Sequence, residues 1–193
     1  MTDYFAFLDQ PRRPWLDPEE LKQAFHQKTL EAHPDAQTPS DRDETFTRLN
    51  EAYQALREPK RRLHHMLALE GGPANTNNVS IPVDIENLFP LVAALIQESE
   101  TVMGKLETST NALSRSLVRP DLIKTAASVR QMVRTLGHLH DEAINELRAK
   151  GDSWISGSSE HRADLEDLYL RFSYLTKWIS ELGERELQLT SAL

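Results

Sequence analysis

Two amphipathic helical patterns near the start of the chain predict a pair of helices. The first pattern begins at Asp17, whose side chain can cap a helix by accepting hydrogen bonds from free amide groups. Pro18 has its φ preset for the first helical position, and Glu20 can close a capping box. Apolar residues follow at near-helical spacing up to Ala32, and Pro34 ends the helix because proline disfavours helical geometry at the preceding residue. These apolar residues are Leu21, Ala24, Phe25 and Leu30.

The second pattern follows a polar segment, residues 37–43, which we interpret as a loop ending in a helix cap. Two helices joined by a short polar loop are expected to pair antiparallel. His33, Pro34 and Asp35 would then lie at the exposed tip of a hairpin, where recognition sites are common. The apolar residues of the second helix, which share one face, are Phe46, Leu49, Tyr53 and Leu56.

Beyond residue 80 the pattern is helical throughout and predicts three long helices with short connections, an arrangement typical of an antiparallel three-helix bundle. Arg119-Pro120-Asp121 is interpreted as the start of the second helix, and residues 151–157 as the loop before the third. The apolar stripes run from Leu88 to Leu106, with an extension through Leu113 and Leu117 left open, from Leu122 to Leu147, and from Leu165 to Leu189.

Gly71-Gly72-Pro73 and the Asn-rich stretch after it have nothing to bury and mark a boundary in the chain. The sequence therefore predicts an all-α protein with an N-terminal helical domain at residues 1–72, a linker at 73–83 and a helical bundle at 84–193.

Composition removes several classes of function. The chain has 193 residues and a formal net charge of -8, and both halves are acidic, which disfavours nucleic acid as a partner. It has no cysteine, which excludes thiolate catalysis and Cys-type metal sites. We expect no membrane partner and a cytoplasmic location, because no signal-like segment or apolar stretch of roughly 20 residues is present.

Candidate chemistry is equally sparse. His138 and Glu142 have a spacing that could share a metal ion, but no third ligand accompanies them, and the adjacent His64 and His65 diverge on a helix. Lys60-Arg61-Arg62 is interpreted as the solvated start of a helix. No phosphate-binding loop or nucleophile elbow is present, so we expect neither an enzyme nor a bound cofactor or metal.

The N-terminal motifs, in this order, resemble the J-domain (DnaJ-like) family of co-chaperones. They are Tyr4-Phe5, Leu21-Lys22-Gln23-Ala24-Phe25, His33-Pro34-Asp35, Leu49-Asn50-Glu51-Ala52-Tyr53 and Glu58-Pro59-Lys60-Arg61-Arg62. The resemblance implies that the segment stimulates the ATPase of a DnaK-type chaperone. Asp35 would pair with an arginine of the chaperone, Pro34 would fix the direction of the loop, and His33 would hold its geometry.

The same resemblance implies that Lys22 and His26, on the helix before the loop, contact the chaperone. The family usually presents a basic face there, but Gln23 and Gln27 stand where further cations are common, and Glu31 reverses one. Ala36 follows the loop where lysine is usual. Weaker electrostatic steering toward the chaperone is the expected consequence.

A J-domain followed by a three-helix domain is similar to the HscB family, which delivers an iron–sulfur cluster scaffold protein to an HscA-type chaperone. Residues 3–5, 63–71 and 171–178 support this similarity, whereas residues 88–95 and the Ser/Thr-rich segment 108–116 depart from the family pattern. The client could therefore be the scaffold or another protein, and a helical adaptor that engages no chaperone is a further alternative. Surplus apolar residues of the bundle, among which Tyr174, Trp154 and Trp178 are candidates, would mark a client surface whose residues the sequence does not identify.

Overall fold

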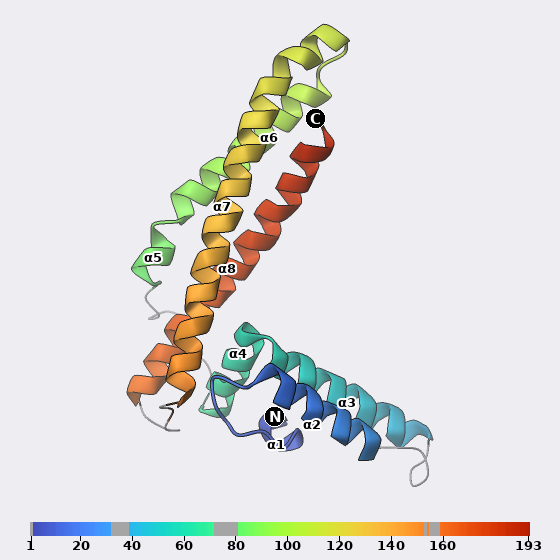
Figure 1. Ribbon diagram of the computed structural model, residues 1–193, viewed down its shortest axis with the longest axis vertical. Helices are drawn as coiled ribbons and strands as arrows, with labels where there is room; N and C mark the ends of the chain where they lie inside the picture. Colours follow the sequence, from blue (N-terminus) through green and yellow to red (C-terminus); the bar gives the residue numbers. More distant parts are fainter. Residues whose placement is uncertain (1, 32–38, 72–80, 153, 155–158) are drawn as a thin grey trace. The chain divides into compact units, whose positions relative to one another are not determined.

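The computed structural model describes residues 2–31, 39–71, 81–152, 154 and 159–193 (Figure 1). Within these residues the regular structure consists of helices, which confirms the predicted all-α class. The helices are α1 (Tyr4–Phe7), α2 (Pro18–Glu31), α3 (Pro39–Arg57), α4 (Pro59–Leu69), α5 (Val83–Glu86), α6 (Phe89–Glu107), α7 (Ala112–Asp152) and α8 (Ser159–Ser191). None of the described helices is both long and apolar enough to cross a membrane.

Internal contacts divide the chain into two compact units. The first unit comprises Met1–Ser80 together with Ile144–Tyr169, and the second comprises Ile81–Ala143 together with Leu170–Leu193. Helices α7 and α8 therefore contribute residues to both units. The boundaries 1–72, 73–83 and 84–193 stay a prediction, since most of the proposed linker lies outside the described residues.

The first unit is built on the predicted helical pair. Helix α2 contacts α3, and α3 also contacts α1 and α4 (Figure 1). Leu21, Leu49 and Leu56 are buried as the apolar pattern predicts. Leu30 and Phe46 are 53% and 48% exposed, because burial in the pair decreases toward the end that bears residues 32–38.

The start of α3 corrects one expectation. Residues 37–43 were predicted to form a loop, yet the helix begins at Pro39. Proline is favoured at the first helical position, since its missing N–H is not needed there. A proline in a polar segment thus starts the helix four residues before the predicted loop ends.

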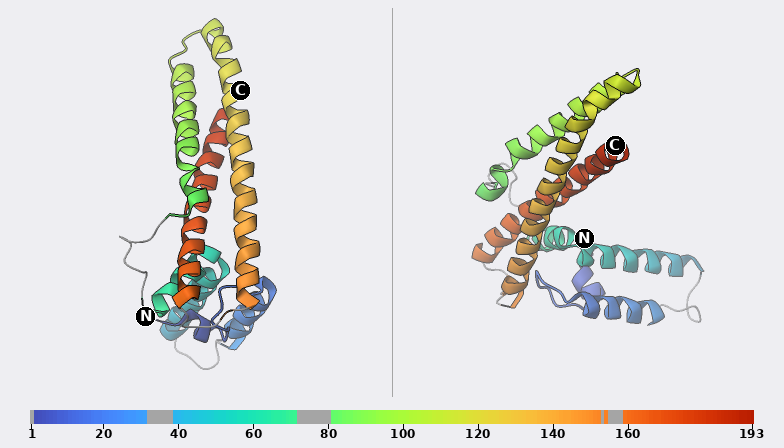
Figure 2. Two further views of the ribbon diagram at one scale, coloured as in Figure 1. Left: turned by 90° about the vertical axis from the view of Figure 1, so that its left-hand side faces the viewer. Right: turned by 45° about the horizontal axis from the view of Figure 1, so that its top comes forward.

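In the second unit, α6, α7 and α8 lie side by side, and successive helices run in opposite directions (Figure 2). A continuous core, which includes Val92, Val129 and Leu182, lies between them. Ion pairs join all three pairs of helices at the surface, and they are Lys105–Asp121, Arg130–Glu186 and Arg185–Glu100. This arrangement confirms the predicted three-helix bundle.

The boundary between α6 and α7 differs from the prediction. Helix α6 ends at Glu107, so the proposed extension through Leu113 and Leu117 is wrong, and both leucines belong to α7. A reciprocal cap starts α7: Ser114 N–H donates to Asn111 Oδ1 at 2.8 Å, and Asn111 N–H donates to Ser114 Oγ at 3.3 Å. The chain therefore turns before Ala112, eight residues upstream of Pro120.

Pro120 lies inside α7 instead of starting it. A proline within a helix leaves one carbonyl, here that of Ser116, without its usual amide donor. Both Ser116 and Pro120 are exposed, so water can reach that carbonyl. Helix α7 continues through Gly151 and Asp152, which were predicted as loop. Helix α8 begins at Ser159, before the first residue of its predicted apolar stripe.

Candidate functional site

The helix that carries the predicted site starts as its sequence indicates. Asp17 Oδ1 accepts hydrogen bonds from the N–H groups of Glu19 and Glu20, at 2.9 and 3.1 Å. These two bonds satisfy amide groups that have no partner within the helix. At the inner face of the pair, Phe25 stacks on Tyr53 of α3 with ring centroids 4.5 Å apart. The direction in which α2 approaches residue 32 is therefore fixed by a cap at one end and aromatic packing along its length.

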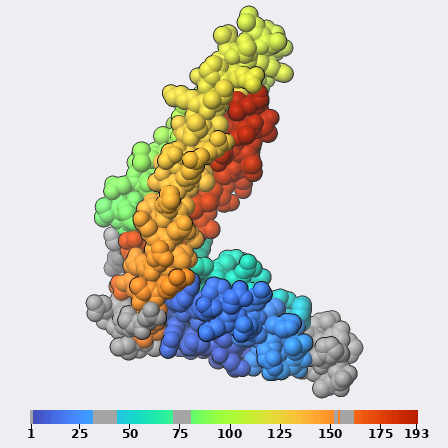
Figure 3. All heavy atoms as spheres, in the orientation of Figure 1, coloured from blue at the N-terminus to red at the C-terminus, as the bar shows by residue number. Residues whose placement is uncertain are grey.

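His33, Pro34 and Asp35 lie outside the described residues, so their roles stay a prediction. Lys22 and His26 are both exposed on α2, whose outer surface is uncovered in Figure 3. Lys22 Nζ lies 3.9 Å from Glu19 Oε2, a loose contact between two well-exposed side chains. The structure thus leaves both side chains accessible, as a role in partner binding requires.

Lys28 and Glu31, towards the end of α2, are engaged within the chain. Lys28 donates a hydrogen bond to Asp9, which raises the pKa of Lys28, and its Nζ lies 3.9 Å from Glu31. Gln27 Nε2 donates to the same Glu31 at 3.0 Å. Of the two lysines on α2, only Lys22 therefore presents its charge largely outward, in agreement with the weak basic face that the sequence indicates.

Arg62, at the base of the hairpin, corrects the interpretation of the basic cluster as solvated. It is 2% exposed, and its Nε and Nη1 donate to the carbonyl oxygens of Pro14 and Leu56 at 2.7 and 2.6 Å. Arg61 beside it is exposed and pairs with Glu58 at 3.2 Å. Arg62 faces inward because α4 packs through this side, which also carries Leu63 and Met66. The buried guanidinium joins the end of α3 to the segment that leads into α2.

Trp15 lies beside this guanidinium. The guanidinium carbon of Arg148, on α7, lies 4.6 Å from the centroid of the Trp15 ring, and that of Arg62 lies 5.9 Å from the same centroid. All of these residues belong to the first compact unit. Nothing in the local sequence signals this contact, because Trp15 and Arg148 are far apart along the chain.

His65 of α4 contacts Tyr4 of α1 through a hydrogen bond and ring stacking. It is 4% exposed, accepts a hydrogen bond from the N–H of Tyr4 through Nε2 at 3.0 Å, and stacks on the Tyr4 ring at 4.5 Å. Burial, assisted by the nearby charge of Arg12 and by His64, lowers the pKa of His65 below its ordinary value. The acceptor role requires a neutral imidazole with its proton on Nδ1.

Acidification is therefore expected to destabilise the first unit through His65. Because its folded-state pKa lies below the unfolded value of 6.5, the unfolded chain takes up the proton first. The free energy of unfolding that the neutral His65 contributes is therefore fully present above pH 6.5 and is lost as the pH falls below that value.

Urea unfolding at several pH values between neutrality and pH 5 measures this loss of stability. His65→Phe should be less stable at neutral pH but lose less stability on acidification, whereas a substitution of the exposed His138 should retain the wild-type slope; equal slopes for all three chains would contradict the assignment.

The second unit carries a candidate client surface on α6. Trp178 is 5% exposed and packs edge-on against Phe89 at 4.9 Å, so this tryptophan belongs to the core and is not surplus. Phe89 is 37% and Leu91 53% exposed. Leu91 also lines a predominantly apolar groove of about 650 Å³ between α6 and α7, together with Leu95 and Met132. Part of the exposed apolar surface of the bundle therefore lies on α6, and further exposed apolar residues, such as Leu117 and Leu187, lie on α7 and α8.

Comparison with known proteins identifies the N-terminal part of the chain. The family model of the DnaJ domain matches residues 3–65, so this segment resembles a DnaJ domain. The co-chaperone protein HscB homolog of Chromobacterium violaceum is 33% identical over 89 residues, which cover 42% of this chain and 51% of that protein. Human DnaJ homolog subfamily A member 4 is 32% identical over 92 residues, 46% of this chain and 22% of that protein.

The chain spans about half the length of the HscB homolog and about a fifth of the length of the DnaJ homolog. Among solved structures, the chaperone HscB from Vibrio cholerae is similar over 97% of this chain and 99% of its own, with a TM-score of 0.56 and 21% identity. The resemblance to J-domain and HscB co-chaperones is confirmed. At this level of identity, the likeness to the solved structure concerns the fold.

Proposed function

We propose that the chain is a co-chaperone that stimulates the ATPase of a DnaK- or HscA-type chaperone through His33, Pro34 and Asp35. The observation that carries the proposal is the DnaJ-domain match across the segment that contains this tripeptide. Asp35 supplies a carboxylate for an arginine of the chaperone, and such a charge-assisted pair is strong when partly desolvated. Lys22 and His26, both exposed on α2, provide adjoining contacts.

The chaperone ATPase rate tests this function directly. Asp35→Asn and His33→Gln are each expected to reduce stimulation roughly tenfold or more, because docking is coupled to the hydrolysis-competent state of the chaperone. Glu51→Gln is the matched control, since it neutralises an exposed carboxylate elsewhere on the hairpin. Stimulation by the Asp35 and His33 variants equal to that by wild type would refute the mechanism.

The second part of the proposal is the client, the scaffold protein on which iron–sulfur clusters are assembled. It is supported by the HscB-like fold over nearly the whole chain and by the exposed apolar surface of α6. The cluster is the cargo of the scaffold and needs no ligand from this chain, in which cysteine is absent. The full chain would thereby bring a client to the chaperone and couple its arrival to ATP hydrolysis.

Leu91→Glu is expected to weaken scaffold binding roughly tenfold or more, because it places a charge in the centre of the apolar surface. Leu113→Glu is the control: Leu113 is 72% exposed and lies on α7, away from that groove. Calorimetric titration with the purified scaffold measures both. If the scaffold does not bind the wild-type chain while ATPase stimulation persists, the client is another protein and the J-domain function stands.

A helical adaptor that engages no chaperone is the second candidate. The pairing of Lys28 with Asp9 and the presence of Glu31 favour it, because they leave α2 with little basic surface. Binding of the full chain to the chaperone at low ionic strength separates the two candidates, since electrostatic steering is strongest there. No binding under those conditions would support the adaptor.

A further inference from the structure

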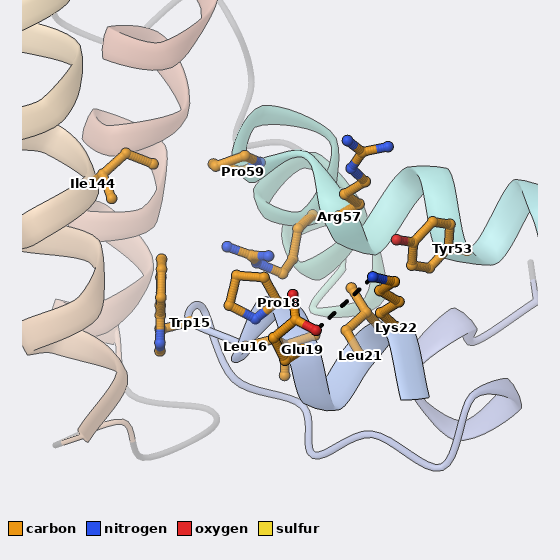
Figure 4. A pocket seen from close by; sticks show the side chains of 11 residues that line it. Trp15, Leu16, Pro18, Glu19, Leu21, Lys22, Tyr53, Arg57, Pro59 and Ile144 are labelled. Carbon is orange, nitrogen blue, oxygen red and sulfur yellow. Dashed lines mark ion pairs between the residues drawn. The ribbon is translucent and has the colours of Figure 1, made fainter. Parts of the chain in front are cut away.

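A cavity at the base of the hairpin contains positive charge that the protein does not neutralise. The cavity has a volume of about 560 Å³ and is lined by Lys22, Arg57 and Arg62, with Glu19 as the single carboxylate (Figure 4). Arg62 is almost fully buried, and its pKa, lowered to about 10 by burial, still leaves it charged at neutral pH. Among the described residues, neither Arg57 nor Arg62 forms an ion pair with a carboxylate.

A buried cation without a counter-ion is costly, and proteins usually pair such a charge. The two carbonyl oxygens that bind Arg62 satisfy two of its donors but carry no net charge. The carboxylate of Glu19 lies 3.9 Å from Lys22 Nζ, so its charge already faces a cation other than the two arginines. An anion that enters the cavity would therefore gain from the buried guanidinium of Arg62, with Lys22 and Arg57 adding attraction at longer range.

The other walls of the cavity are apolar and aromatic. Figure 4 shows Trp15 and Ile144 on one side, facing Pro18 and Pro59, with Tyr53 near Lys22. All of these residues belong to the first compact unit. Such walls bury an apolar body, while the few charged groups orient it. The space is within the size range of small-molecule sites, roughly 300–1,000 Å³.

We propose that this cavity binds an organic carboxylate, whose acid group meets Arg62 and whose apolar body lies against Trp15. A carboxylate fits better than a phosphate, because two nitrogen atoms of Arg62 are already bonded and leave few donors for a larger anion. The acid is either a free small molecule or an acidic side chain next to an apolar residue in a bound protein. None of the residues that line the cavity belongs to the tripeptide at residues 33–35.

Calorimetric titration of the full chain with phenylbutyrate tests the site without any chaperone. Phenylbutyrate is expected to bind, and its neutral amide, which has the same body, to bind roughly tenfold more weakly or not at all. Arg57→Gln should weaken binding of the acid severalfold, because it removes a cation that lines the cavity, and this exposed residue can be replaced without disturbing the core. Arg61→Gln, an exposed arginine on α4 outside the cavity, should bind as wild type does.

Competition then separates the two sources of the acid. Displacement of phenylbutyrate by the chaperone or the scaffold protein would assign the site to an acidic side chain of that protein, and retention would assign it to a free acid. The proposal is overturned if phenylbutyrate and its amide bind equally, if neither binds, or if Arg57→Gln and Arg61→Gln have the same effect. Because none of these outcomes depends on ATPase stimulation, failure of this site leaves the co-chaperone function untouched.

Discussion

An Arg62→Ala chain is expected to lose about 2–4 kcal/mol of unfolding free energy in its first compact unit. The substitution leaves the buried carbonyl oxygens of Pro14 and Leu56 without their donor, and each unsatisfied group costs roughly 1–3 kcal/mol. It also removes the aliphatic stem of an almost fully buried side chain. Urea unfolding followed by circular dichroism measures the loss, and hydrogen exchange in α3 and α4 locates it.

Arg61→Ala is the matched control for this prediction. Arg61 is the neighbouring residue, has the same chemistry and pairs with Glu58, but its side chain is 59% exposed. Exposed ion pairs contribute little, so this variant should remain within about 0.5 kcal/mol of wild type. Equal stability of the two variants would mean that Arg62 has no role in joining α3 to the segment before α2. The interpretation of Lys60-Arg61-Arg62 as a solvated helix start would then be correct.

The predictable parts of the fold are those that local chemistry determines. Asp17 and Pro18 start α2 as expected, because capping depends only on residues within one helical turn. The three-helix bundle follows from apolar residues that repeat at helical spacing over long segments. Lys22 and His26 are exposed as a binding role requires, since both lie on the outer side of a helix whose inner side carries Leu21.

The wrong helix boundaries were predicted where the same residue type is compatible with two local structures. Pro120 and Pro39 both stand in polar surroundings, yet one lies inside a helix and the other begins one. The Asn111–Ser114 cap decides the first case, and an N-x-x-S cap is a weaker signal than a Ser or Thr followed by Glu. A proline is tolerated at an exposed position of a long helix that packing holds in place.

Arg62 could have been placed correctly from periodicity. It lies one helical turn before Met66 and next to Leu63, so an arginine on this face of α4 must be buried or distort the packing. Its partners could not have been foreseen, because Pro14 is 48 residues away along the chain. The same holds for the cavity beside it, whose lining residues come from the segment before α2 and from α2, α3, α4 and α7.

A Gly151→Ala chain is expected to lose about 1–3 kcal/mol of unfolding free energy, the usual range for an overpacked site. A β-carbon at position 151 would lie 2.5 Å from Cβ of Trp15 and 3.4 Å from its backbone nitrogen. These atoms belong to or adjoin the backbone, so rotation of the Trp15 side chain cannot relieve the clash. The backbone cannot move freely either, because Arg62 binds the carbonyl of Pro14 and Arg148 lies over the Trp15 ring.

Gly183→Ala provides a control with the opposite expected sign. A β-carbon at position 183 would meet nothing within 4 Å, and the residue lies in the interior of α8. Alanine there should stabilise the chain by about 0.5–1 kcal/mol, because glycine loses more conformational freedom when a helix forms. The same chemical change thus separates close packing from helix propensity. Stabilisation by both substitutions would show that the end of α7 does not pack against Trp15 in solution, whereas opposite signs would establish that contact and the wall of the cavity that Trp15 forms.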